Sequence, residues 1–146
     1  MNQYPTKKQI LTQQPRFNKE TIKLTKLWKT LALKNWKTDT NQTKHHKLKT
    51  LITTLSQTNN KTKPKTTTNT EYFYDPNKKT IHLNINNPSI ISTLHELAHH
   101  LYGPNEIQAC RWSIWLFKKC FPEQYKKLEW KNHLLTKKKH TTINAP

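Results

Sequence analysis

The amino-acid sequence predicts a small α+β domain. At 146 residues the chain is long enough for about one domain. Apolar residues recur every three or four positions in several segments, which indicates amphipathic helices. One segment near the middle instead alternates apolar and polar residues around a turn, which indicates a β-hairpin. Helices before and after a hairpin are typical of the α+β class.

Two amphipathic helices are predicted in the N-terminal part, over residues 20–37 and 43–56, where lysines separate the apolar positions. Both are expected to pack on the core. His45 and His46 lie at the start of the second helix and are expected to be solvated. Residues 1–18 are polar and contain two prolines, so they are predicted to be a mobile N-terminal segment.

The hairpin is predicted over residues 71–85. Residues 57–70 before it are rich in Thr, Asn and Lys and contain Pro64, which indicates a linker or loop. Asp75-Pro76-Asn77 is a turn sequence between aromatic and β-branched residues. Because side chains alternate along a strand, one face is expected to be polar and the other to meet the core. The polar face comprises Thr80, His82 and Asn84; the core face comprises Ile81, Leu83 and Ile85.

A third helix is predicted between Asn87-Pro88, an N-cap followed by proline at the first helical position, and Gly103. Gly103 is the only glycine of the chain and precedes Pro104, so it is expected to end the helix with a positive φ. The helix has one apolar stripe, formed by Ile90, Ile91, Leu94, Leu97, Ala98 and Leu101.

This helix contains His95-Glu96-Leu97-Ala98-His99, an H-E-x-x-H motif. His95 and His99 are one turn apart, about 6 Å along the axis, so both imidazoles can bind a single Zn²⁺. Glu96 points to the adjacent side, where it can reach a water rather than the metal. The motif indicates a zinc hydrolase; the alternative is a pair of structural histidines.

Glu106 is the best-placed third zinc ligand, because a catalytic zinc takes three protein ligands and leaves one position open. Asn105 is expected to cap the next helix, which puts Glu106 in its first turn, seven residues after His99. The alternative is an ordinary first-turn glutamate that the helix dipole favours. Other candidate ligands, with no spacing argument, are His133, Asp75, Glu129 and His100.

The motif and the downstream Glu106-Ile107-Gln108-Ala109-Cys110 resemble the zincin metallopeptidases, and within them the compact gluzincin-like group. SprT-type zincins, which act on proteins attached to DNA, are a related alternative. The resemblance implies a single zincin-like domain over residues 19–135. It further implies a zinc-dependent peptidase that acts on a protein or peptide, with Glu96 as general base and an edge strand beside the cleft. Tyr102 or His100 are candidate oxyanion donors.

The C-terminal part is expected to form a buried helix over residues 106–119 and a last helix over 123–133, followed by a disordered basic tail, 136–146. Cys110 and Cys120 are too far apart on one helix for a disulfide and are expected to be free thiols. Arg111 either pairs with a carboxylate near the site or caps the helix surface.

Lysine dominates the charge, with 24 Lys against 2 Arg and a net charge of +18. Such a chain can attract nucleic acid nonspecifically, so the alternative function is a basic nucleic-acid-binding protein with a structural or vestigial zinc site. A loss of affinity for nucleic acid as salt rises would distinguish that function. The N-terminus has no signal-peptide pattern and no stretch has the apolar length of a membrane span, so an intracellular, cytoplasmic protein is expected. The oligomeric state stays open.

Overall fold

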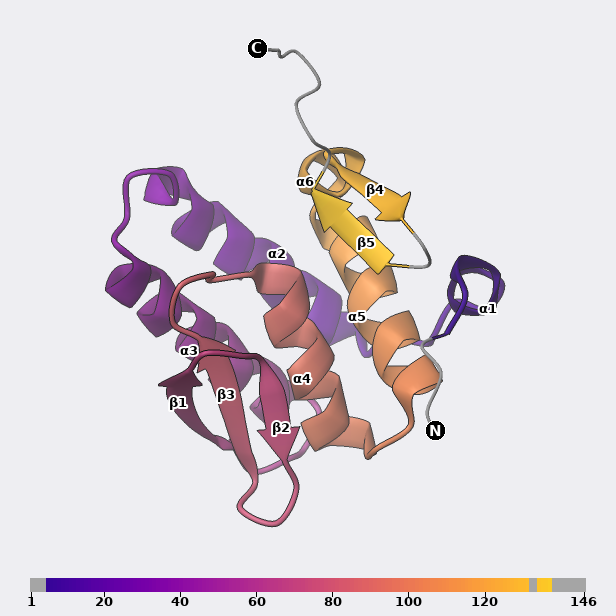
Figure 1. The fold of residues 1–146 in the computed structure, drawn as a ribbon, viewed down its shortest axis with the longest axis horizontal. Helices are drawn as coiled ribbons and strands as arrows, with labels where there is room; N and C mark the ends of the chain where they lie inside the picture. The colour runs from indigo at the N-terminus through magenta and orange to yellow at the C-terminus, as the bar shows by residue number, and fades with distance from the viewer. Residues whose placement is uncertain (1–4, 132–133, 138–146) are drawn as a thin grey trace.

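The structure, a computed structural model, describes residues 5–131 and 134–137 and confirms the α+β class. A three-stranded sheet lies at one side of a group of helices, and a two-stranded sheet follows near the C-terminus (Figure 1). In chain order the elements are α1 (Lys7–Leu11), α2 (Lys19–Ala32), the 3-10 helix η1 (Leu33–Asn35), α3 (Asn41–Thr58), β1 (Lys65–Asn69), β2 (Phe73–Asp75), β3 (Thr80–Asn84), α4 (Ile90–Tyr102), α5 (Glu106–Cys120), α6 (Pro122–Lys126), β4 (Leu128–Lys131) and β5 (Leu134–Lys137).

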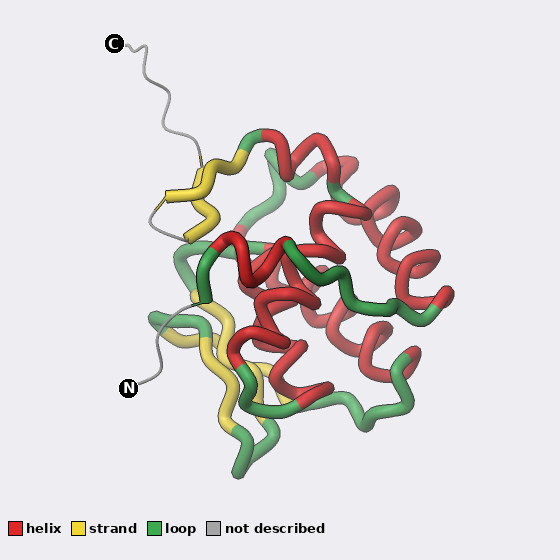
Figure 2. The backbone as a smooth tube through the Cα atoms, turned by 90° about the vertical axis from the view of Figure 1, so that its right-hand side faces the viewer, coloured by secondary structure: helices red, strands yellow, loops and turns green. Residues whose placement is uncertain are grey.

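Helix α4, which contains the H-E-x-x-H motif, lies between the three-stranded sheet and α5 and also contacts α3. In Figure 2 the strands gather on one side of the molecule and most helices on the other. The predicted apolar stripe is confirmed as the buried face of α4, except that Ile91 is only half-buried. Leu94 and Leu97 are fully buried. Each contributes about 1.5–3 kcal/mol of burial free energy, which holds the helix in a single orientation.

The sheet has the order β1-β3-β2, with β3 in the middle. The predicted hairpin is confirmed, since β2 and β3 are antiparallel with Tyr74 opposite Ile81. Ile81 and Leu83 are fully buried as predicted, but Ile85 lies beyond the end of β3 and is 47% exposed. The strand directly before the motif helix is β3, and the zincin resemblance implies that this strand is an edge strand. It is not an edge strand, because β3 pairs with β1 on one side and with β2 on the other.

Strand β1 corrects the prediction that residues 57–70 are a linker or loop. Lys65 to Asn69 pair in parallel with β3, with Thr67 opposite His82. Residues 66–68 are all threonine, and β-branched side chains favour extended backbone. Most of β1 is exposed, so its sequence lacks the apolar alternation by which strands are recognised.

The start of α4 differs from the prediction, because its N-cap is Ser89 and not Asn87. The Ser89 hydroxyl accepts a hydrogen bond from the Ser92 N–H. The Tyr72 hydroxyl donates to the Asn87 carbonyl and accepts from the Ser89 N–H, so it fixes the backbone before the cap. Pro88 consequently precedes the helix instead of opening it.

The predicted mobile segment 1–18 contains helix α1, so that prediction is wrong for the residues the helix occupies; residues 1–4 lie outside the described part of the chain. A capping box joins Thr6 and Gln9. Ile10 is fully buried in a cluster with Ile114 of α5, and the Trp115 indole N–H donates to the Ile10 carbonyl at 3.0 Å. Burial of one isoleucine therefore attaches the segment to the domain.

The predicted last helix over residues 123–133 is confirmed only as far as Lys126, and it is wrong for residues 128–131; residues 132–133 lie outside the described part of the chain. Helix α6 ends at Lys126, and β4 then pairs with β5 in antiparallel fashion, with Glu129 opposite Thr136. Trp130 and Leu135 pack against the cluster around Ile10, so long-range packing favours strands here. Of the predicted tail, residues 136–137 belong to β5 and residues 138–146 lie outside the described residues.

His45 is buried, contrary to the prediction that it is solvated, whereas His46 is exposed. The His45 Nε2–H donates to the Asn84 carbonyl at 2.7 Å. This hydrogen bond joins α3 to the end of β3, so the imidazole has a structural contact that its position at a helix start does not reveal.

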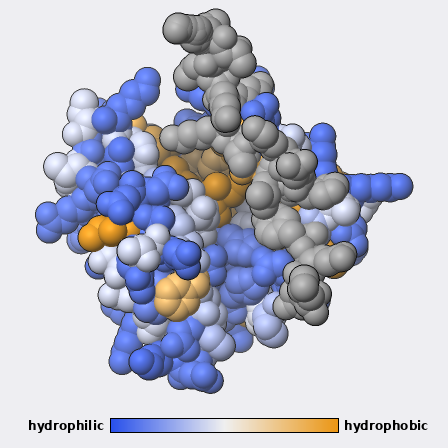
Figure 3. Space-filling model, in the orientation of Figure 1, coloured by the Kyte–Doolittle hydropathy of each residue, from blue (hydrophilic) through white to orange (hydrophobic). Residues whose placement is uncertain are grey.

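Hydrophilic side chains dominate the face shown in Figure 3, where hydrophobic ones form separate patches. Among the described residues, only one lysine forms a salt bridge, Lys47 with Asp39. In the same part of the chain, no helix combines the length and the apolar character that crossing a membrane requires.

Candidate metal centre

His95 and His99 project from the same side of α4. Their ring centroids are 4.9 Å apart and the ring planes are nearly perpendicular, at 81°. Both side chains are mostly buried, with exposed fractions of 18% and 13%. The four-residue spacing therefore produces the shared face that the motif predicts.

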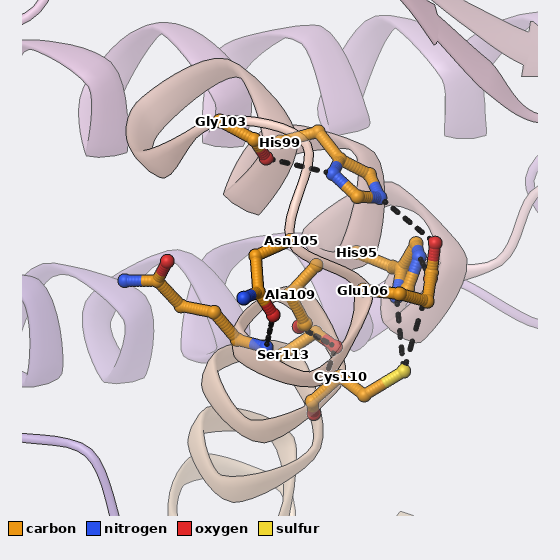
Figure 4. A network of polar contacts seen from close by, with 9 residues as sticks. His95, His99, Gly103, Asn105, Glu106, Ala109, Cys110 and Ser113 are labelled. Atoms are coloured by element: carbon orange, nitrogen blue, oxygen red, sulfur yellow. Dashed lines mark hydrogen bonds and ion pairs between the residues drawn. The ribbon is translucent and has the colours of Figure 1, made fainter. Parts of the chain in front are cut away.

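The turn after α4 brings Glu106 to the two histidines. Gly103 ends α4 with a φ of +102°, and Asn105 caps α5 by accepting a hydrogen bond from the Gln108 N–H. Both predicted features are confirmed. Glu106 is consequently the first residue of α5, and its carboxylate points back toward α4 (Figure 4).

The Glu106 carboxylate contacts both imidazoles. Its Oε1 lies 2.5 Å from His95 Nε2, and its Oε2 lies 3.5 Å from His99 Nε2. One candidate ligand atom from each of the three residues lies within 4.8 Å of the others. Ligand atoms around a tetrahedral zinc are about 3.4 Å apart, so the three side chains are close enough together to reach one ion. Their role as ligands stays a prediction.

The remaining ring nitrogens have partners that orient the two imidazoles. The His99 Nδ1–H donates to the Gly103 carbonyl at 2.9 Å, which leaves the Nε2 lone pair directed toward Glu106. The Cys110 sulfur lies 3.8 Å from His95 Nδ1 and 3.9 Å from Glu106 Oε1. The sequence interpretation missed Cys110 as a neighbour of the centre, although it lies one turn after Glu106 on α5 and so shares its face.

The charges of the cluster are coupled. The hydrogen bond from His95 lowers the pKa of Glu106, although partial burial opposes this shift. Burial lowers the pKa of His95, but hydrogen bonds with Cys110 and Glu106 outweigh it and raise the pKa to about 10. Without metal, the cluster therefore holds a proton on His95 beside a charged Glu106.

This coupling predicts how the metal-free protein responds to pH. The pKa of His95 rises from 6.5 to about 10 on folding, so its contribution to stability is complete below pH 6.5 and is lost as pH rises toward 10. We expect the thermal denaturation midpoint of the metal-free protein to decrease as the pH is raised from 6.5 to 9. His95→Gln should flatten this fall, whereas His46→Gln, an exposed control, should leave it unchanged. Equal slopes in the wild type and His95→Gln would contradict the coupling.

Glu96 lies beside the cluster and is not one of its three members. The side chain is half-buried, and no hydrogen bond to its carboxylate occurs within the described residues. Burial raises the pKa of Glu96, and the charges on His95 and His99 partly offset the rise. A carboxylate with a raised pKa and no fixed partner is available to accept a proton.

Of the other candidate ligands, those that the structure describes are not part of the cluster. The Asp75 carboxylate accepts hydrogen bonds from the Asn77 and Lys78 N–H groups of the hairpin turn. Glu129 lies on β4, and His133 is outside the described residues. Within residues 5–131 and 134–137, only His95, His99 and Glu106 form a group that could hold a metal.

The two candidate oxyanion donors are engaged elsewhere. His100 Nδ1 accepts from the Tyr74 hydroxyl at 2.8 Å, and its Nε2–H donates to the Thr62 carbonyl at 2.7 Å. The Tyr102 hydroxyl donates to Asn59 Oδ1 at 3.3 Å. Neither group forms a hydrogen bond with Glu106, His95 or His99.

His82 and Arg111 also have contacts away from the cluster. The His82 ring stacks on Phe73 with a centroid separation of 3.8 Å. Within the described residues Arg111 neither pairs with a carboxylate nor caps the helix surface: its Nε–H donates to the Gln9 carbonyl and its Nη1 to Gln13 Oε1. Arg111 therefore fastens the N-terminal segment to α5.

Comparisons of the chain with protein-family models, curated proteins and solved structures give no match. A functional assignment therefore depends on the geometry of the cluster and on the chemistry of its side chains.

Proposed function

We propose that this protein is a zinc-dependent peptidase whose metal centre comprises His95, His99 and Glu106. The observation that supports the proposal is the convergence of these three side chains, from two helices, beside a half-buried Glu96. A pair of structural histidines would need only hydrogen-bond partners. It would not need a carboxylate that contacts both Nε2 atoms.

The donor set fits zinc better than a hard cation. Two imidazole nitrogens and one carboxylate are typical zinc ligands, whereas Ca²⁺ and Mg²⁺ prefer oxygen ligands alone. Three protein ligands leave one coordination position open, which is the arrangement of a catalytic site. When bound, zinc supplies a Lewis acid that makes water a nucleophile near neutral pH.

The chain's own residues then have separate tasks. His95 and His99 bind through Nε2, and the Gly103 carbonyl holds the His99 ring in that orientation. Glu96 accepts a proton from the attacking water and passes it to the leaving amine as the peptide bond breaks. Its raised pKa suits this exchange, because a general base works best when its pKa approaches the working pH.

Metal content and peptide hydrolysis, measured on the same preparation, test the proposal. We expect native mass spectrometry to show one zinc per chain and a quenched-fluorescent peptide library to be cleaved. Chelation should abolish cleavage, and zinc but not Mg²⁺ should restore it. Cleavage that survives complete removal of zinc would contradict the proposal, as would a zinc-loaded chain that cleaves no peptide of the library.

A further inference from the structure

A second site is indicated by where the two arginines of this chain lie. The sequence has 24 Lys but only Arg16 and Arg111, far apart in the sequence. Both line a single surface cavity of about 520 Å³, between the N-terminal segment and α5. Among the described residues no aspartate or glutamate lines this cavity, so these residues place no negative charge beside the two guanidinium groups.

Both guanidinium groups have N–H donors that are available to a ligand. The Arg111 Nε–H donates to the Gln9 carbonyl at 2.8 Å, and one Nη1 N–H donates to Gln13 Oε1 at 3.3 Å. These two hydrogen bonds fix the plane of the guanidinium group and do not involve its other N–H groups. Arg16 is exposed and forms no hydrogen bond or ion pair with any part of the chain that the structure describes. A planar guanidinium presents paired donors that match the oxygens of a carboxylate or a phosphate.

The rest of the cavity is partly apolar. Tyr102 and Trp112 both line it, with ring centroids 5.9 Å apart, and Ile107 contributes an aliphatic side chain. Trp112 is almost completely buried, whereas Tyr102 is 41% exposed. The cavity therefore combines an aromatic wall with a cationic rim, and its volume is within the range of small-molecule sites.

This cavity is separate from the candidate metal centre. At 100° per residue, Arg111 lies about 140° and Gln108 about 200° around α5 from Glu106. Figure 4 shows the side chains of Asn105, which lines the cavity, and Glu106 on different sides of the start of α5. A ligand in the cavity would therefore contact a different side of α5 from the side on which Glu106 lies.

We propose that this cavity binds a small molecule with a carboxylate or phosphate group on an apolar body, and that Arg16 and Arg111 hold the oxyanion. The inference does not depend on the metal centre or on peptidase activity. A ligand bound in this cavity is expected to change the NMR signals of the two guanidinium groups.

The scarcity of arginine makes the test direct, because this chain of 146 residues has only two guanidinium Nε–H signals in a ¹H–¹⁵N NMR spectrum. Arg16→Lys removes one of them and so assigns both. We expect both signals to shift together and saturate when phenyl phosphate or benzoate is added at constant ionic strength. The tighter of the two probes identifies the preferred oxyanion.

Matched variants separate a built site from general attraction to a basic protein. Arg16→Gln should weaken binding about tenfold, because a charge-assisted hydrogen bond is lost. Lys23→Gln removes the same charge from an exposed position on α2 and should change affinity less than twofold. Guanidinium signals that do not move with either probe would overturn the proposal. Equal effects of the Arg16 and Lys23 variants would also overturn it.

Discussion

Replacing Glu96 by glutamine should lower kcat/KM for peptide hydrolysis by about 10²–10⁴-fold while one zinc per chain is retained. Glutamine has the same shape as glutamate but cannot accept a proton from water. The loss should appear in kcat, because proton transfer belongs to the chemical step. Zinc should stay bound, since Glu96 is outside the group formed by His95, His99 and Glu106.

Steady-state kinetics on zinc-loaded protein, together with metal analysis of the same sample, measures this effect. Glu123→Gln is the matched control, because Glu123 is an exposed glutamate on α6, away from the cluster, and its variant should keep wild-type activity. A Glu96→Gln protein that holds zinc and hydrolyses peptides at the wild-type rate would remove Glu96 from the mechanism.

Replacing Glu106 by alanine should weaken zinc binding by more than about 100-fold. Removal of a group that only orients a ligand already costs about 10–100-fold in affinity, and Glu106 is expected to be a ligand itself. The contacts of its two carboxylate oxygens with His95 and His99 support that role. Activity should fall with zinc occupancy, and a competition titration against a chromophoric chelator measures the affinity.

Two controls sharpen this result. Glu20→Ala removes another first-turn glutamate, from α2, and tests the alternative that Glu106 acts only on the helix dipole; its zinc affinity should not change. Because the Cys110 sulfur lies 3.9 Å from Glu106 Oε1, a thiolate could take the place of the lost carboxylate. The Glu106→Ala variant is therefore also measured with Cys110→Ala. Wild-type affinity in that double variant would show that Glu106 is not a ligand.

Local patterns predicted the helix, the turn and the cap that position His95, His99 and Glu106. The four-residue spacing of His95 and His99 needs only a helix to bring the rings together, and a helix is specified by the apolar stripe of α4. Gly103 and Asn105 act within one turn of chain, so their conformations follow from their own side chains. Each of these features depends on residues that are near in sequence.

Features that depend on distant partners were not predicted. Strand β1 is polar and forms because it pairs with β3. Helix α1 is attached because Ile10 is buried against α5. The β4–β5 pair forms where helical spacing was expected, because Trp130 and Leu135 pack on the same cluster. In each case tertiary contacts outweigh the local propensity.

The sequence by itself determined that two imidazoles share a helix face, that α4 ends at the sole glycine, and that a glutamate opens the next helix. Only the tertiary structure decided that Glu106 contacts both Nε2 atoms and that the Cys110 sulfur lies near His95 Nδ1. It also decided that Arg16 and Arg111 line the same cavity. Turns and caps follow from the chemistry of neighbouring residues. The distance between side chains on different helices instead depends on how the whole core packs α4 against α5.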